Sequence, residues 1–184
     1  MLENFDQLLK KAKDGDDSAF GQIYKSFAPP LEKFLYLRSK SNYEELASDT
    51  WTGVVLKLKE FNGNEIQFRA WLYTIARNRM IDYFRKNNTV PFDPTIKSFE
   101  NLAGQNYAED PTVADENLRE INKFLRANLK TLEYEVVLLR VVSDLSVAEV
   151  AKIFKKPESA IRVIQHRALK KLSRMVVIKS PPED

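Results

Sequence analysis

The stretch from Phe68 to Lys86, FRAWLYTIARNRMIDYFRK, carries aromatic rings, cations and an amide at helical spacing. At roughly 100° per residue, one side of this predicted helix is apolar and another is polar and aromatic. The apolar side holds Phe68, Leu72, Ile75, Ala76, Met80 and Tyr83, and the other holds Trp71, Thr74, Asn78, Asp82 and Arg85. Rings stack on unpaired bases, guanidinium and ammonium groups hold phosphates, and amides bind base edges. The second side, bordered by Arg77, Lys86 and the polar ends of Tyr73 and Tyr83, is therefore a candidate surface for melted DNA or RNA. The alternative is a helix that serves only the core and has basic ends.

A second pattern lies about seventy residues downstream and has the spacing of a helix-turn-helix. Ser146 and Glu149 form a predicted capping box that begins a short helix, and Lys155, Lys156 and Pro157 end it. A longer helix is predicted from Glu158 to about Met175, with Ile161, Ile164, Gln165, Ala168 and Leu172 inward. Its outward side carries Ser159, Arg162, Val163, His166 and Lys170, with Arg167 at the edge. Arginine can bind guanine and valine can contact a thymine methyl, whereas a solvated basic helix face is the alternative.

Composition narrows the classes of protein. At 184 residues, with 43% hydrophobic and 11% aromatic residues, the chain can bury a core of one domain or of two small helical ones. It contains no cysteine, and a single histidine, His166, argues against a histidine-based metal site or triad. The amino end lacks a long apolar run, which predicts neither a signal peptide nor a membrane span and so a cytoplasmic protein. We expect no catalytic residues, metal or cofactor.

The charges define the predicted domains. The formal net charge is only +3, but positive residues collect at 69–86 and at 162–179, while the segment between them is acidic and contains Pro91, Pro94 and Pro111. We predict an all-α protein in which residues 1–87 form one helical domain, residues 88–115 an acidic linker, and residues 116–184 a second domain.

Within the first domain, helices are predicted at 5–13, from Asp16 or Asp17 to Pro29, from Leu31 onward, and at 43–61. Pro29 and Pro30 are expected to interrupt the second of these, because proline lacks the backbone N–H and its ring clashes with the preceding turn. In the second domain, helical patterns cover 113–129 and 132–142.

The two motif blocks, preceded by EELASDTW at 44–51, resemble those of a bacterial extracytoplasmic-function (group 4) sigma factor. The resemblance runs from about Phe20 to Leu172. It implies that the first domain (region 2) docks on the β′ clamp of core RNA polymerase and melts the minus-10 promoter element. It also implies that the second domain (region 4) recognises the minus-35 element while it packs on the β flap. An anti-sigma protein that covers both domains is a further partner that the family implies.

Carried over by motif position, the resemblance assigns three sets of residues. The polymerase-clamp set is Glu45, Leu46, Ser48, Asp49 and Trp51. The minus-10 and melting set is Trp71, Arg77, Asn78, Asp82, Arg85 and Lys86. The minus-35 set is Glu158, Ser159, Arg162, Val163, His166, Arg167 and Lys170.

Three positions depart from the family pattern. Ser48 stands where an amide is usual, and Lys155 stands near a common glycine, where a left-handed lysine would cost on the order of 1 kcal/mol. Ile164, which the periodicity turns inward, replaces an arginine found in many members. Promoter specificity therefore cannot be copied from relatives.

Two other classes of protein compete with this assignment. An autonomous, dimeric helix-turn-helix regulator would bind its operator tightly without polymerase. A metal-dependent nuclease would use Asp49 and Asp82, but no acidic cluster with ligand spacing supports it, and Asp82 is better explained by pairing with Arg85 or Lys86.

Overall fold

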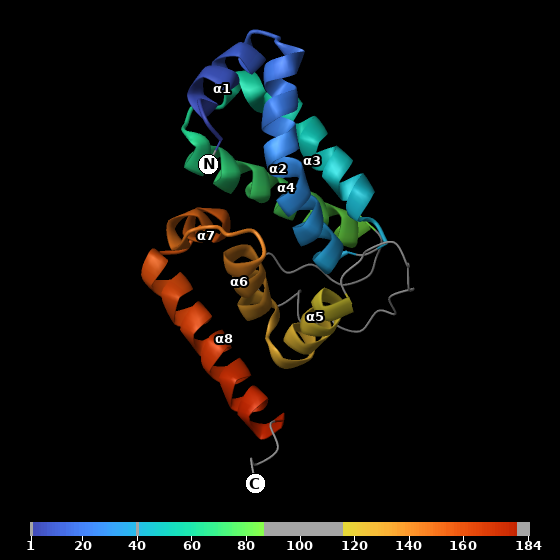
Figure 1. The fold of residues 1–184 in the computed structure, drawn as a ribbon, viewed down its shortest axis with the longest axis vertical. Coiled ribbons are helices and arrows are strands. Elements are labelled where there is room, and N and C mark those ends of the chain that lie inside the picture. Colours follow the sequence, from blue (N-terminus) through green and yellow to red (C-terminus); the bar gives the residue numbers. More distant parts are fainter. Residues whose placement is uncertain (1, 40, 87–115, 180–184) are drawn as a thin grey trace.

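The computed structural model describes residues 2–39, 41–86 and 116–179, and these form helices without any β-strand. Figure 1 shows two groups of helices, one above the other, with α8 extending away from the first group. The upper group, here called the N-terminal domain, contains α1 to α4, and the lower group, the C-terminal domain, contains α5 to α8. The predicted all-α, two-domain fold is confirmed. The predicted linker, residues 88–115, lies outside the described residues.

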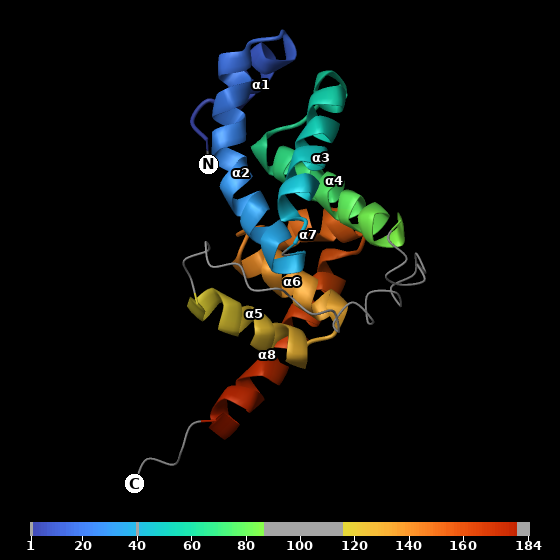
Figure 2. The same cartoon turned by 90° about the vertical axis from the view of Figure 1, so that its right-hand side faces the viewer.

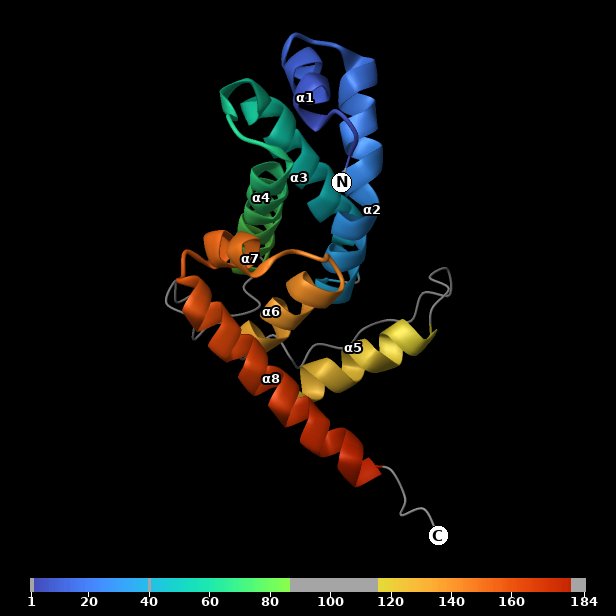
Figure 3. The ribbon, with the colours of Figure 1, turned by 60° about the vertical axis from the view of Figure 1, so that its left-hand side comes forward.

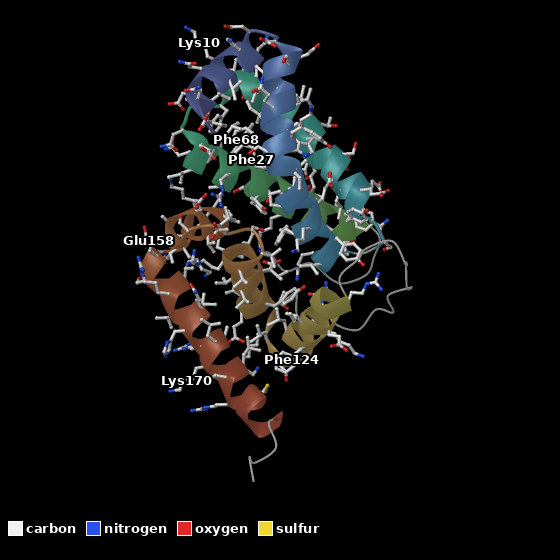
Figure 4. All side chains as sticks on the ribbon, viewed as in Figure 1. Lys10, Phe27, Phe68, Phe124, Glu158 and Lys170 are labelled. Atoms are coloured by element: carbon white, nitrogen blue, oxygen red, sulfur yellow. The ribbon has the colours of Figure 1, made fainter. Side chains whose placement is uncertain are left out.

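The N-terminal domain is built around aromatic rings. Its elements are α1 (Phe5–Lys13), α2 (Asp17–Arg38), α3 (Tyr43–Lys57), a 3-10 turn (Leu58–Glu60) and α4 (Glu65–Lys86). The rings of Phe5, Phe27 and Phe68 bring α1, α2 and α4 together, and the Phe27 and Phe68 centroids are 5.3 Å apart. Figure 4 shows Phe27 and Phe68 close together between the helices. Such edge-on and tilted ring pairs bury large apolar areas and hold helices of different direction in one core.

Helix α2 is continuous through Pro29 and Pro30, so the predicted interruption is wrong. The Asp16 carboxylate caps its first turn by accepting from the N–H groups of Ser18 and Ala19, as predicted. The prolines remove two backbone donors, but the residues around them are buried on both sides, from Ile23 and Phe27 to Leu31 and Phe34. Burial of this apolar surface outweighs the local proline cost, which periodicity alone does not reveal.

Helix α4 is covered on more than one side. The predicted core residues Phe68, Leu72, Ala76 and Met80 are fully buried against the rest of the N-terminal domain. On a different side, α7 of the C-terminal domain lies against α4, an arrangement visible in Figures 1 and 3. Helix α4 is therefore a shared element, and its exposed surface is smaller than the sequence predicts.

The C-terminal domain consists of α5 (Glu116–Asn128), α6 (Thr131–Val141), α7 (Val147–Phe154) and α8 (Glu158–Lys179). Its helices surround a core of buried residues from α6, α7 and α8, which includes Leu138, Leu139, Val150, Ile161 and Ala168. Figure 2 shows α5 and α8 on the side of α6 away from the N-terminal domain. No helix among the described residues has the length and apolarity that crossing a membrane requires.

The turn between α7 and α8 contains the predicted left-handed lysine. Lys155 has φ 51° and ψ 43°, and its N–H and that of Lys156 donate to carbonyls of the last turn of α7. This geometry ends a helix in the manner usually provided by glycine.

Replacing Lys155 with glycine should stabilise the protein by about 1 kcal/mol, because glycine adopts positive φ without the Cβ clash. Denaturant unfolding of the full chain measures this change. The matched control is Lys152→Gly, an exposed position inside α7, which should destabilise the protein by about 1 kcal/mol. An unchanged or lower stability of Lys155→Gly would show that the turn carries no strain.

Candidate nucleic-acid interface

The outward face of α8 is the most accessible cationic surface among the predicted sites. Ile161 and Ala168 are fully buried and fix the rotation of the helix about its axis. All seven predicted minus-35 residues are exposed on the other side: Glu158, Ser159, Arg162, Val163, His166, Arg167 and Lys170. Figure 4 shows Glu158 and Lys170 on the side of α8 that points away from α6. This placement leaves the face free for a DNA groove.

The position of α8 is set by the helices before it. The Ser146 hydroxyl accepts from the Glu149 N–H and the Glu149 carboxylate accepts from the Ser146 N–H, which confirms the predicted capping box of α7. Arg140 of α6 donates to the Gln165 side chain on α8 and to the Leu145 carbonyl before α7. One guanidinium thus links α6 to α8 and to the loop that precedes α7.

Ion pairs on the exposed surfaces are partly solvated. On α8, Arg162 pairs with Glu158 at 3.0 Å, and on α4, Arg85 pairs with Asp82 at 3.0 Å. Arg85 is one of the two partners, Arg85 or Lys86, predicted for Asp82. The side chains of Arg162 and Arg85 are 65% and 56% exposed. Because such pairs contribute little to stability, either arginine can exchange its carboxylate for a phosphate.

The remaining predicted minus-10 residues differ in accessibility. Asn78, Arg85 and Lys86 are exposed on α4. Trp71 is half-buried, because its indole stacks on Phe61 with ring centroids 4.7 Å apart and planes inclined by 24°. The stacking covers one face of the indole, and only part of the ring remains for a base to contact.

Arg77 of the minus-10 set contacts the C-terminal domain. Its Nε lies 3.3 Å from Glu135 Oε2 on α6, and its guanidinium lies over the Phe154 ring of α7 at 4.9 Å from the centroid. The other Glu135 oxygen, Oε1, is 2.8 Å from Nη2 of Arg38, the last residue of α2. The Glu135 side chain is only 2% exposed, and a buried carboxylate needs charged partners. Two arginines of the other domain provide them.

Tyr73 does not border a nucleic-acid surface as predicted, because it is buried between the domains at 2% exposure. Its ring packs on Phe34, and desolvation raises the pKa of Tyr73 to about 12, while the Ser143 side chain and the Arg69 charge oppose the increase. Arg69, one turn before Tyr73, donates to the carbonyls of Ser143 and Asp144 and lies 3.4 Å from the buried Glu149 carboxylate. Arg69, Tyr73 and Arg77 therefore form one side of α4 that faces the C-terminal domain.

The end of α2 is capped by the C-terminal domain. Nη2 of Arg126 on α5 donates to the Leu37 and Arg38 carbonyls at 2.6 and 3.0 Å. The Tyr134 hydroxyl and the Asn122 amide donate to the same Leu37 carbonyl. These donors satisfy terminal carbonyls of the helix, and the cation complements its dipole.

The predicted polymerase-clamp residues divide by burial. Glu45, Ser48 and Asp49 are exposed on α3, whereas Leu46 and Trp51 are buried and position the helix. Beside them, a groove of about 550 Å³ runs between α2 and α3. Its lining combines apolar and polar side chains: Tyr24, Glu32, Tyr43, Glu44, Ala47, Ser48, Trp51, Thr52, Val55 and Leu56.

Arg38, Arg69, Glu135 and Glu149 were not predicted as site residues. Each forms an ion pair across the domain boundary with a residue distant in sequence, such as Arg38 with Glu135. Glu149 was assigned only to the capping box. The signal that could have suggested a role was an acidic residue, Glu135, within the otherwise apolar run of α6.

The structure is that of a helical protein with two domains. One contains a helix-turn-helix, and the other exposes Asn78, Arg85 and Lys86 on α4. Residues 23–90 match the family model for Sigma-70 region 2, and residues 127–174 match the model for Sigma-70, region 4. Together the two matches span more than half of the chain. The chain belongs to the extracytoplasmic-function (ECF) group of sigma-70 RNA polymerase sigma factors. The predicted family is confirmed, and the protein is a transcription initiation factor of this type.

Individual relatives agree with this membership. The chain is 30% identical over 176 residues to the ECF RNA polymerase sigma factor BldN of Streptomyces coelicolor. The aligned region covers 92% of this chain and 65% of BldN. It is 28% identical over 167 residues to the ECF RNA polymerase sigma factor SigX of Bacillus subtilis, covering 86% of this chain and 84% of SigX. The fold is similar to that of CnrH, solved in complex with the cytosolic domain of CnrY, with a TM-score of 0.68, 22% identity and coverage of 94% and 97% of the two chains. It is also similar to RpoE of Bartonella quintana, solved with the anti-sigma factor NepR, with a TM-score of 0.65, 22% identity and coverage of 88% and 98%.

The raised pKa of Tyr73 predicts a loss of stability in alkali. Below pH 10 the hydroxyl is protonated in both the folded and unfolded states, and the free energy of unfolding is unaffected. Between about pH 10 and 12 the unfolded state ionises first, so stability falls, by about 1 kcal/mol at pH 11. Urea unfolding at pH 9 and pH 11 should show a smaller decrease for Tyr73→Phe than for the wild type. The control Tyr24→Phe, at a 39% exposed position, should retain the wild-type decrease; equal behaviour of the two variants would contradict the assignment.

Proposed function

We propose that this protein binds core RNA polymerase, recognises a promoter at its minus-35 and minus-10 elements and helps to open it. Residues 1–87 act as the region 2 domain and residues 116–184 as the region 4 domain, joined by the linker at 88–115. The observation that carries the proposal is the occurrence of both sigma-70 region matches, in order, in a chain whose α8 exposes seven polar, basic or small side chains.

The minus-35 element is bound by α8. Arg162 and Arg167 supply guanidinium donors for guanine edges or phosphates, Val163 is 46% exposed and can contact a thymine methyl, and His166 and Lys170 extend the surface. Ser159 and Glu158 lie at the helix N-terminus, where the serine hydroxyl and backbone N–H groups suit a phosphate.

The minus-10 element is bound by α4 as single-stranded DNA. Asn78 presents an amide for a base edge, and Arg77, Arg85 and Lys86 supply positive charge for phosphates. Trp71, fixed by Phe61, offers the remaining ring edge for stacking, and Asp82 orients Arg85. Arg77 must leave Glu135 to take part.

Core polymerase is the main protein partner. Glu45, Ser48 and Asp49 form the polar part of the surface for the β′ clamp, supported from beneath by Leu46 and Trp51, and the C-terminal domain packs on the β flap. A solved structure of similar fold, bound to an anti-sigma factor, supports an anti-sigma protein as a further partner. Because polymerase and chromosome are the sites of action, we place the protein in the cytoplasm, without a catalytic activity of its own.

Run-off transcription with purified core polymerase on a library of promoter fragments tests this function. The wild-type chain should direct specific transcripts, and Asn78→Ala and Arg162→Ala should each reduce them about tenfold or more, as loss of one base contact costs roughly 1–3 kcal/mol. The matched control is Lys25→Ala, which removes a positive charge from an exposed position of α2 and should leave transcription unchanged. Tight duplex binding by the chain alone, without polymerase-dependent transcripts, would favour the autonomous regulator instead.

A further inference from the structure

Three arginines of the N-terminal domain are held by two glutamates of the C-terminal domain. Arg38 and Arg77 share Glu135, and Arg69 pairs with Glu149. We call these five residues the interdomain charge cluster. The glutamate side chains are 2% and 3% exposed, and those of Arg38, Arg69 and Arg77 are 6%, 21% and 23% exposed.

The three arginines would form a continuous cationic surface without the C-terminal domain. Arg38 and Arg77 lie against the two oxygens of one carboxylate, and Arg69 and Arg77 are eight residues apart on the same side of α4, a rise of about 12 Å. This surface adjoins the face of α4 that carries Asn78, Arg85 and Lys86. A carboxylate and a phosphodiester both accept from guanidinium groups, so the ligand that would replace the glutamates is a nucleic-acid backbone.

The arrangement in which the two domains pack together, here called closed, is suited to reversible opening. Burying an ion pair costs hydration of both charges, so these pairs offer little net advantage over the separated domains in water. The contacts of Arg126 and Tyr134 with the end of α2 are also polar and can be replaced by water on opening. A polyanion that binds only the opened N-terminal domain therefore shifts the equilibrium toward the open form.

We propose that Arg38, Arg69 and Arg77 form a binding site for the phosphate backbone of single-stranded DNA, which Glu135 and Glu149 occupy in the closed protein, so that the C-terminal domain competes with DNA. The proposal extends the proposed function, because it concerns how the minus-10 face becomes available. Arg38 and Arg69 are additional members of that face. Glu135 and Glu149 act as internal substitutes for phosphate.

Binding of a short fluorescein-labelled oligothymidine to the full chain, without polymerase, tests the site by fluorescence anisotropy. The double variant Glu135→Gln/Glu149→Gln should bind about tenfold more tightly than the wild type, because the closed fraction no longer reduces the apparent affinity. Glutamine preserves side-chain shape and the capping box of α7. The matched control is Glu60→Gln/Glu120→Gln, which makes the same change in net charge at exposed positions. An equal gain in the control would overturn the proposal.

A second variant separates opening from added charge. Arg126→Gln removes a positive charge but also removes donors to the carbonyls at the end of α2, so it should open the domains and tighten oligothymidine binding. Weaker binding by this variant would contradict the proposal. In the opened Glu135→Gln/Glu149→Gln background, Arg69→Ala should lower the slope of log K against log salt by about 0.7, the value for one phosphate contact on a single strand. An unchanged slope would exclude Arg69 from the site.

The distance between the domains provides an independent measurement. Since the chain contains no cysteine, Gln22→Cys and Ser173→Cys allow specific attachment of a donor and acceptor dye at exposed positions of α2 and α8. Energy transfer should fall in the Glu135→Gln/Glu149→Gln protein and when oligothymidine is added to the wild type. Constant transfer in both cases would overturn the proposal.

The two proposals fail in different ways. If the wild type supports promoter-specific transcription but neither variant gains DNA affinity, the sigma function stands and the blocked site is wrong. If affinity and energy transfer change as expected but polymerase-dependent transcripts are absent, the blocked site stands and the promoter function is wrong.

Discussion

The relative placement of the two domains depends on one buried carboxylate, that of Glu135. It projects from α6 and lies between arginines that come from the end of α2 and the middle of α4. A charge at 2% exposure is tolerated only when its partners are present, and both partners belong to the other domain. The contacts of Glu135 with Arg38 and Arg77 and the packing of the two domains therefore depend on each other.

This constraint gives the two predicted DNA surfaces different accessibility. The outward face of α8 is exposed in the closed protein, so a ligand can reach it without any movement of the N-terminal domain. On α4, by contrast, the C-terminal domain covers Arg69, Tyr73 and Arg77. Asn78, Arg85 and Lys86 of the same helix remain exposed. The same helix thus presents part of its polar surface to solvent and part to a neighbouring domain.

Local sequence rules predicted the features that depend on a few adjacent residues. The capping box of Ser146 and Glu149, the left-handed Lys155 and the pairing of Asp82 with Arg85 all follow from short-range geometry. The helices at 5–13 and from 158 onward begin at the residues that the sequence predicted. The candidate faces of α4 and α8 followed from helical periodicity, and burial agrees with it for Phe68, Leu72, Ile161 and Ala168.

Features that depend on distant residues could not be predicted in this way. Pro29 and Pro30 lie inside a continuous helix because tertiary packing outweighs their local effect. Tyr73 occupies a helical position that periodicity assigns to a boundary, and it is buried by Phe34 of α2 together with Ser143 of the other domain. Glu135 has no local signal for its two partners, which are 97 and 58 residues away in the chain.

The contrast between exposed and buried ion pairs suggests an order for DNA binding. Arg162 and Arg85 pair with carboxylates that are themselves half exposed, so a phosphate can replace these partners while the domains stay in place. Arg38 and Arg77 can exchange Glu135 only if the whole C-terminal domain moves, because that carboxylate is fixed in α6. Binding through α8 can therefore precede opening, and DNA held by α8 would then be close to the arginines of α4 as the domains separate, which raises its effective concentration there. If DNA binds as proposed, the C-terminal domain would first block the basic side of α4 and then bring the DNA close to it.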